Sequence, residues 1–144
     1  MKILWTDGSA VPNPGKGGFA VIEQTLDGGK PVVLGSEENS TNIRMEGKAM
    51  IAAIEYAGEE GCEIHSDSEF WINVLTKWAS GWESRGWRKS RGEIMNLDIV
   101  KELYGLYCKY PVELVWVRGH VGVELNEMAD EWANKAREGA EIEK

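Results

Sequence analysis

The chain has 144 residues, a formal net charge of −8 and two cysteines. A chain of this length fits one domain that buries roughly 68–70% of its unfolded surface, so its core needs no disulfide. Cys62 and Cys108 show no metal-ligand or redox spacing, which favours two buried thiols in a reducing compartment and indicates no zinc site. Because we find neither a leader pattern nor an apolar run approaching ~20 residues, we expect a soluble, cytoplasmic domain over residues 1–144.

The net negative charge of the chain disfavours a polyanionic partner. One segment, however, is locally basic. Basic residues and tryptophans are interleaved in this segment, and Glu83 is the single acid between residues 77 and 91. The basic residues and tryptophans are Lys77, Trp78, Trp82, Arg85, Trp87, Arg88, Lys89 and Arg91. We call residues 77–95 the basic projection. Such a local basic, aromatic patch is typical of nucleic-acid contact.

The first third of the chain predicts an antiparallel meander. A strand containing Asp7 is followed by a Gly/Pro-rich turn over 8–18, a second strand over 19–22, the turn 27–29 and a third strand over 31–34. Pro31 indicates that the third strand begins at a sheet edge.

Helices and parallel strands follow. The patterns predict a helix capped by 40–42 and ended by Gly58 and Gly61, a strand over 62–67, a helix from Ser68 to Trp78, a helix over 97–107, a strand over 111–117 and a helix over 124–136. We expect the acidic end, 138–144, to fray.

Four acids occupy positions that face the predicted sheet: Asp7, Glu46, Asp67 and Asp130. Each has a structural alternative: an Arg or helix N-terminus as the partner of Asp7, a helix-dipole role for Glu46, an N-cap for Asp67, and a solvated helix face for Asp130. If instead the four converge, a cation must neutralise them, and carboxylate oxygens suit Mg²⁺ or Mn²⁺.

Five motifs occur in one order along nearly the whole chain. They are 6-TDGS-9 with the turn 13–18, 41-TNIRME-46, 66-SDS-68, Trp82 with 86-GW-87, and 119-GHVG-122 with Asn126, Glu127 and Asp130. Together they resemble type 1 ribonuclease H. The resemblance implies a ribonuclease H-like α/β fold: a five-stranded mixed sheet, three antiparallel strands then two parallel, with helices on both faces.

The resemblance also implies chemistry. Asp7, Glu46, Asp67 and Asp130 would hold two Mg²⁺ ions ~4 Å apart, with Mn²⁺ able to substitute. The RNA strand of an RNA/DNA hybrid would be cut to leave 5′-phosphate and 3′-hydroxyl ends, and His120 would assist proton movement or product departure.

Substrate contacts are implied as well. Asn13 and Asn42 would read ribose 2′-hydroxyls, the group that distinguishes RNA from DNA. The remaining contacts are implied at Thr41, Arg44, Ser68, Trp78, Trp82, Arg85, Trp87, Arg88, Lys89 and Asn126. We expect a monomer without an N-terminal hybrid-binding domain.

The chain departs from the family pattern at Ile43, Glu69 and Val123. These departures concern substrate affinity, and the catalytic residues are all present. A non-catalytic hybrid-binding module would not need all four acids. An integrase-like or resolvase-like nuclease would lack the basic projection and the Gly-His-x-Gly loop, and a structural acidic domain explains none of the spacings.

Overall fold

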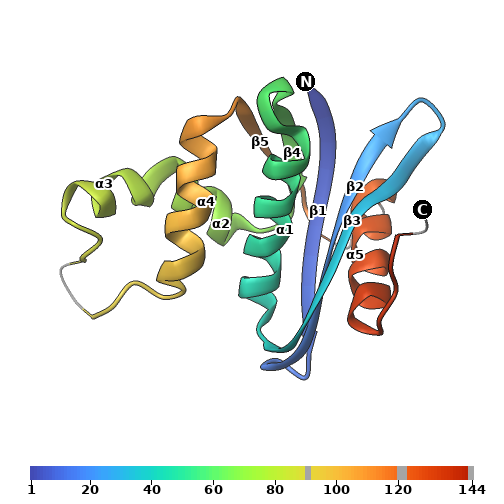
Figure 1. Cartoon of the computed structure of the whole chain (residues 1–144), viewed down its shortest axis with the longest axis horizontal. Coiled ribbons are helices and arrows are strands. Elements are labelled where there is room, and N and C mark those ends of the chain that lie inside the picture. Colours follow the sequence, from blue (N-terminus) through green and yellow to red (C-terminus); the bar gives the residue numbers. More distant parts are fainter. Residues whose placement is uncertain (90–91, 120–122, 143–144) are drawn as a thin grey trace.

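The computed structural model describes residues 1–89, 92–119 and 123–142. One five-stranded sheet has the order β3-β2-β1-β4-β5 (Figure 1). Its strands are β1 (Lys2–Val11), β2 (Gly15–Thr25), β3 (Gly28–Ser40), β4 (Cys62–Ser66) and β5 (Val112–Trp116). β1, β2 and β3 pair antiparallel, while β1–β4 and β4–β5 pair parallel. The predicted strand order is confirmed, and β3, which carries Pro31, lies at the sheet edge. The turn predicted over residues 8–18 is wrong in length, because β1 and β2 stay paired as far as Val11 and Lys16.

Helices cover both faces of the sheet (Figure 1). They are α1 (Asn42–Ala57), the short 3₁₀ turn η1 (Gly58–Glu60), α2 (Glu69–Asn73), the π-helical turn η2 (Val74–Trp78), α3 (Ala79–Ser84), α4 (Leu97–Lys109) and α5 (Glu124–Arg137). The helix predicted to end at Trp78 therefore continues through a π-helical turn to Ser84, and α3 lies away from the sheet. Every helix within the described ranges is too short or too polar to span a bilayer.

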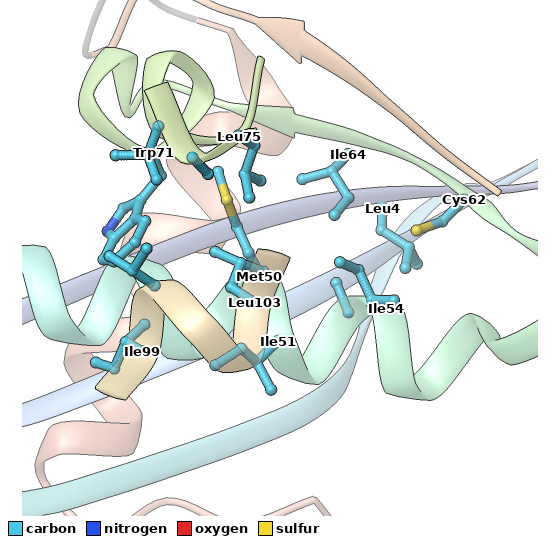
Figure 2. Close-up of a cluster of buried hydrophobic side chains, with 14 of the residues drawn as sticks. Leu4, Met50, Ile51, Ile54, Cys62, Ile64, Trp71, Leu75, Ile99 and Leu103 are labelled. Carbon is cyan, nitrogen blue, oxygen red and sulfur yellow. The ribbon is translucent and has the colours of Figure 1, made fainter. Parts of the chain in front are cut away.

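Two hydrophobic clusters lie on opposite faces of the sheet. The larger one joins β1 and β4 to α1, η2 and α4 through residues such as Leu4, Ile64, Met50, Leu75 and Leu103 (Figure 2). The smaller one joins Trp5 and Ile22 to Ala129 of α5. Since side chains alternate along a strand, the β1 residues at odd positions share the α5 face with Trp5.

Glycines allow α1 and α5 to approach the sheet closely. A Cβ atom on Gly8 of β1 would lie 2.3 Å from the carbonyl carbon of Met45 and 2.4 Å from the amide nitrogen of Glu46. A Cβ atom on Gly18 of β2 would lie 2.4 Å from the carbonyl oxygen of Ala133. Any larger residue would push a helix outward, so these glycines bring acids from both helices close to β1.

The cysteines differ in environment. Cys62 is buried, as predicted, and burial raises the pKa of its thiol to about 11. Cys108 is exposed, so the prediction of a buried thiol there is wrong. The reason is its place near the end of α4, whose buried residues Ile99, Val100 and Leu103 lie in the first two turns.

Candidate active site

Three predicted carboxylates converge at the end of β4. Asp7 in β1, Glu46 in α1 and Asp67, immediately after β4, each place one oxygen within 4.8 Å of the others. The ladder between β1 and β4 ends at the pair Trp5 and His65, while β1 continues to Val11. Asp7 therefore lies beyond the end of that ladder, where carboxylates from α1 and from the β4 end can reach it.

The structural alternatives for these three acids do not apply. Asp67 does not cap α2, because Ser68 is the N-cap and its hydroxyl accepts from the amide of Trp71 at 3.3 Å. Glu46 lies beyond the first turn of α1, which contains no acid. Asp7 accepts a hydrogen bond from the amide of Gly8 at 2.9 Å, and no salt bridge within the described residues includes any of the three.

The crowding of negative charge has a direct electrostatic consequence. Burial, together with the charges of Asp67, Asp130 and Glu46, raises the pKa of Asp7 to about 9 against the opposing Gly8 hydrogen bond. Burial and the charge of Asp67 likewise raise the pKa of Glu46 to about 7. A hard divalent cation would replace the protons and remove the repulsion, so the oxygen donors fit Mg²⁺ or Mn²⁺.

Two further predicted residues reach this site from α5. Asp130 is half-buried and acts electrostatically on Asp7, although it stands outside the tight group of three. Asn126 is buried, and its amide nitrogen lies 3.5 Å from a carboxylate oxygen of Asp67. Asn126 therefore contacts a candidate metal ligand, although the sequence suggested a substrate contact.

Ser68 also has a place inside the site. It is 6% exposed, and its hydrogen bond to Glu46 lowers the pKa of that carboxyl against the larger effect of burial. The hydroxyl therefore supports Glu46 while capping α2. Sequence reasoning identified the residue but not its partner.

The two asparagines predicted to read ribose join the β1–β2 turn to the start of α1. The side-chain oxygen of Asn13 accepts from the amide of Asn42 at 3.1 Å, and the side-chain oxygen of Asn42 accepts from the amide of Ala10 at 2.6 Å. Thr41 caps α1 by accepting from the amide of Arg44 at 3.1 Å. Because both asparagine oxygens are used internally, their NH₂ groups are the donors left for a ligand.

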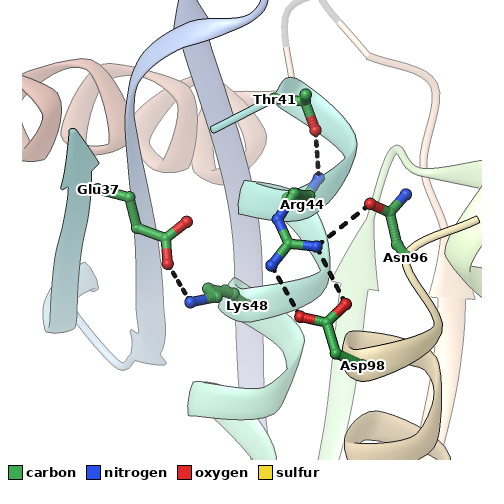
Figure 3. Close-up of polar contacts among 6 residues, drawn as sticks. All are labelled: Glu37, Thr41, Arg44, Lys48, Asn96 and Asp98. Carbon is green, nitrogen blue, oxygen red and sulfur yellow. Dashed lines mark hydrogen bonds and ion pairs between the residues drawn. The ribbon is translucent and has the colours of Figure 1, made fainter. Parts of the chain in front are cut away.

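Arg44 is paired within the protein. Its guanidinium donates to both carboxylate oxygens of Asp98, at 3.1 and 2.9 Å, and to the side-chain oxygen of Asn96 at 3.3 Å (Figure 3). A second ion pair, Lys48 with Glu37, lies one turn further along α1. Arg44 thus ties α1 to the start of α4, and its contact with substrate stays a prediction.

The basic projection exposes its described cations and Trp78, whereas Trp82 and Trp87 are half-buried against the larger hydrophobic cluster. Trp78 is 41% exposed and packs against Phe70 and Trp82. Arg85, Arg88 and Lys89 are exposed and line a hollow with Trp82. Trp87 packs edge-on against Tyr104 of α4. Arg91 lies outside the described residues.

His120, predicted to be catalytic, also lies outside the described residues. The chain that leads to it passes close to the acids, because a Cβ atom on Gly119 would lie 2.6 Å from a carboxylate oxygen of Asp67.

Comparison with known proteins identifies relatives along nearly the whole chain. The family model described as RNase H matches residues 1–138. A curated protein named Ribonuclease H from Acidiphilium cryptum is 38% identical over 138 residues, covering 94% of this chain and 85% of that protein. Another, from Alkalilimnicola ehrlichii, is 40% identical over 140 residues, covering 91% of this chain and 90% of that protein.

Solved structures share the fold. LC9-RNase H1, described as a type 1 RNase H with the type 2 active-site motif, is 27% identical with a TM-score of 0.74, covering 96% of this chain and 74% of that one. LC11-RNase H1, solved in complex with an RNA/DNA hybrid, is 22% identical with a TM-score of 0.66, covering 96% and 97%. The second likeness concerns the fold alone.

Proposed function

The chain belongs to the ribonuclease H family, and we propose that it is an endoribonuclease that hydrolyses the RNA strand of RNA/DNA hybrids to 5′-phosphate and 3′-hydroxyl ends. The observation that carries the proposal is the convergence of Asp7, Glu46 and Asp67 within 4.8 Å, without a salt bridge to a described residue. A structural acidic domain would gain nothing from such a costly cluster.

Asp7, Glu46, Asp67 and Asp130 are the proposed ligands of two Mg²⁺ ions, with Mn²⁺ able to substitute. When bound, such ions supply an activated water and stabilise charge on the leaving 3′-oxygen. The protein contributes a buried set of oxygens whose mutual repulsion favours the exchange of protons for a cation. His120 assists proton movement or product departure.

Substrate recognition is divided between two surfaces. Near the acids, the amide NH₂ groups of Asn13 and Asn42 donate to ribose 2′-hydroxyls of the RNA strand. Thr41 and Arg44 lie beside the backbone of the same RNA strand. At the basic projection, Arg85, Arg88 and Lys89 contact phosphates, while Trp78, Trp82 and Trp87 pack on sugars of the DNA strand. Ser68 and Asn126 act through Glu46 and Asp67, as their contacts support.

A single assay tests the proposal. Labelled RNA/DNA hybrid, duplex DNA, duplex RNA and single-stranded RNA are incubated with the protein, each with and without Mg²⁺. We expect cleavage of the hybrid alone, within its RNA strand and with Mg²⁺ present. Cleavage of duplex DNA would instead favour an integrase-like or resolvase-like nuclease, and binding of the hybrid without cleavage would favour a binding module.

A further inference from the structure

Three polar side chains join β1 to the last turns of α5 beside the acidic site. Ser9 donates to the side-chain oxygen of Asn134 at 3.1 Å, and Arg137 donates to the Ser9 hydroxyl at 3.0 Å and to the same Asn134 oxygen at 2.5 Å. We call Ser9, Asn134 and Arg137 the polar rung. All three are half-buried, which strengthens their hydrogen bonds relative to bonds in open water.

The distance from Asp7 to Ser9 along β1 nearly equals the distance from Asp130 to Asn134 along α5. Ser9 follows Asp7 by two residues and so points to the same face of β1, about 6.6 Å further along the strand. Asn134 follows Asp130 by four residues, about 6 Å further along the same face of α5. A bond between Ser9 and Asn134 therefore places Asp130 opposite Asp7.

A contact one turn earlier on α5 extends this alignment. Asn126 precedes Asp130 by four residues and approaches Asp67. One stripe of α5 thus presents Asn126, Asp130 and Asn134 in turn to Asp67, Asp7 and Ser9.

When Asp7 is ionised and no cation is bound, its charge and that of Asp130 repel each other, which pushes α5 away from β1. We propose that the polar rung positions Asp130 against Asp7, holding α5 at the register that the metal site needs. Ser9, Asn134 and Arg137 are then positioning residues that act through Asp130. This inference rests on the proposed function, because it assigns Asp130 to the metal site.

The test removes the polar rung without touching an acid. Ser9→Ala and Asn134→Ala should each lower kcat for hybrid cleavage about 10-fold, since a small misplacement of a ligand is enough to do so, while KM stays within about twofold. Ser9→Thr keeps the hydroxyl and should retain activity. The loss in the double alanine variant should be smaller than the sum of the two single losses, because both substitutions remove the same Ser9–Asn134 bond, although each also removes a bond to Arg137.

A second measurement does not depend on activity. Calorimetric titration of the protein with Mn²⁺ should show affinity lowered about fivefold in both alanine variants, the equivalent of about 1 kcal/mol. Tyr56→Phe is the matched control: it removes another bond between elements, from Tyr56 to Glu23 at 2.6 Å, and should lower stability without changing kcat or Mn²⁺ affinity.

The outcomes are separable. Wild-type kcat and Mn²⁺ affinity in both alanine variants would overturn the inference, as would a raised KM at unchanged kcat, which would make the polar rung a substrate contact. Failure of the wild-type protein to cut hybrid would refute the proposed function, while the Mn²⁺ titration would still test the polar rung. Should an alanine variant fail to fold, Asn134→Ser replaces it, with losses expected in the same direction.

Discussion

Asp7 in the acidic site is 6% exposed, whereas Trp78 in the basic projection is 41% exposed. Asp7 is held by a central strand, and Gly8 lets α1 approach it closely. In the described part of the basic projection, the exposed cations instead lie on either side of the short helix α3, at Lys77 before it and at Arg85, Arg88 and Lys89 after it. Ionised carboxylates in the first region carry a desolvation cost that a proton or a cation must offset, whereas the second region holds its charge in water at little cost.

This difference predicts different responses to mutation. In the acidic site, a single changed group should abolish chemistry and leave the protein more stable, because the site is assembled against its own repulsion. In the basic projection, each substitution should weaken hybrid binding by a similar amount, because each leaves one more phosphate without a cation. The free energy of unfolding should hardly change.

The largest effect is expected at the acids. Asp7→Asn or Asp67→Asn should lower cleavage of hybrid by about 10³-fold or more, because each removes an anionic group from the proposed metal site. The same variants should unfold without metal at an equal or higher urea concentration than the wild-type protein. Glu113→Gln, at an exposed acid of β5, is the control and should change neither quantity. Full activity in either Asn variant would refute the metal-site assignment.

The stability of the metal-free protein should depend on pH through Asp7. Its pKa is about 9 when folded against 3.8 as the ordinary value, so between these limits the folded state keeps a proton that the unfolded state has lost. The free energy of unfolding therefore falls as pH rises. Between pH 5 and pH 8, the gain in the free energy of unfolding of Asp7→Asn over wild type should grow by about 4 kcal/mol, since each of the three pH units contributes about 1.4 kcal/mol.

This pH effect is measured by urea unfolding in a chelating buffer. Saturating Mg²⁺ should reduce the stability advantage of Asp7→Asn over wild type, because in the wild-type folded state the ion replaces the proton. A gain that shrinks as pH rises would mean that the Asp7 carboxylate is stabilised by another group.

A smaller effect is expected in the basic projection. Replacing Arg85, Arg88 and Lys89 together with Gln should raise KM with little change in kcat. The log–log slope of binding against salt should flatten by about 0.7–0.9 for each phosphate that is no longer neutralised. Lys30→Gln with Lys109→Gln, at exposed positions on β3 and α4, is the matched control. An unchanged slope would mean that the basic projection faces away from the hybrid.

The smallest effect concerns Glu69, an exposed acid in the first turn of α2, two residues after Asp67. Its charge repels a polyanion equally in ground and transition states, so Glu69→Gln should lower KM about two- to threefold with little change in kcat. Kinetics at two salt concentrations tests this, since the advantage should shrink at high salt. The alternative pairing of Glu69 with Arg44 is disfavoured, because Arg44 is bound to Asp98. A higher KM would contradict the repulsion argument.

The sequence by itself determined the elements and the candidate acids. Apolar periodicity located every strand and the three long helices, because burial of one face leaves a local pattern. The chain also revealed Asp7, since a carboxylate in an apolar strand is conspicuous without any knowledge of its neighbours. The π-helical turn η2 was missed, because the pattern through Phe70 and Leu75 is equally compatible with an ordinary helix.

Only the tertiary structure decided the partners. Arg44 and Asp98 are 54 residues apart and Ser9 and Asn134 are 125 apart, so no local pattern links them. The four-residue spacing of Asn126, Asp130 and Asn134 could have suggested a shared face of α5, but not which strand residues it meets. Local periodicity reports whether a side chain is buried. Which two side chains touch depends on how closely the helices pack, and here glycines such as Gly8 and Gly18 set that approach.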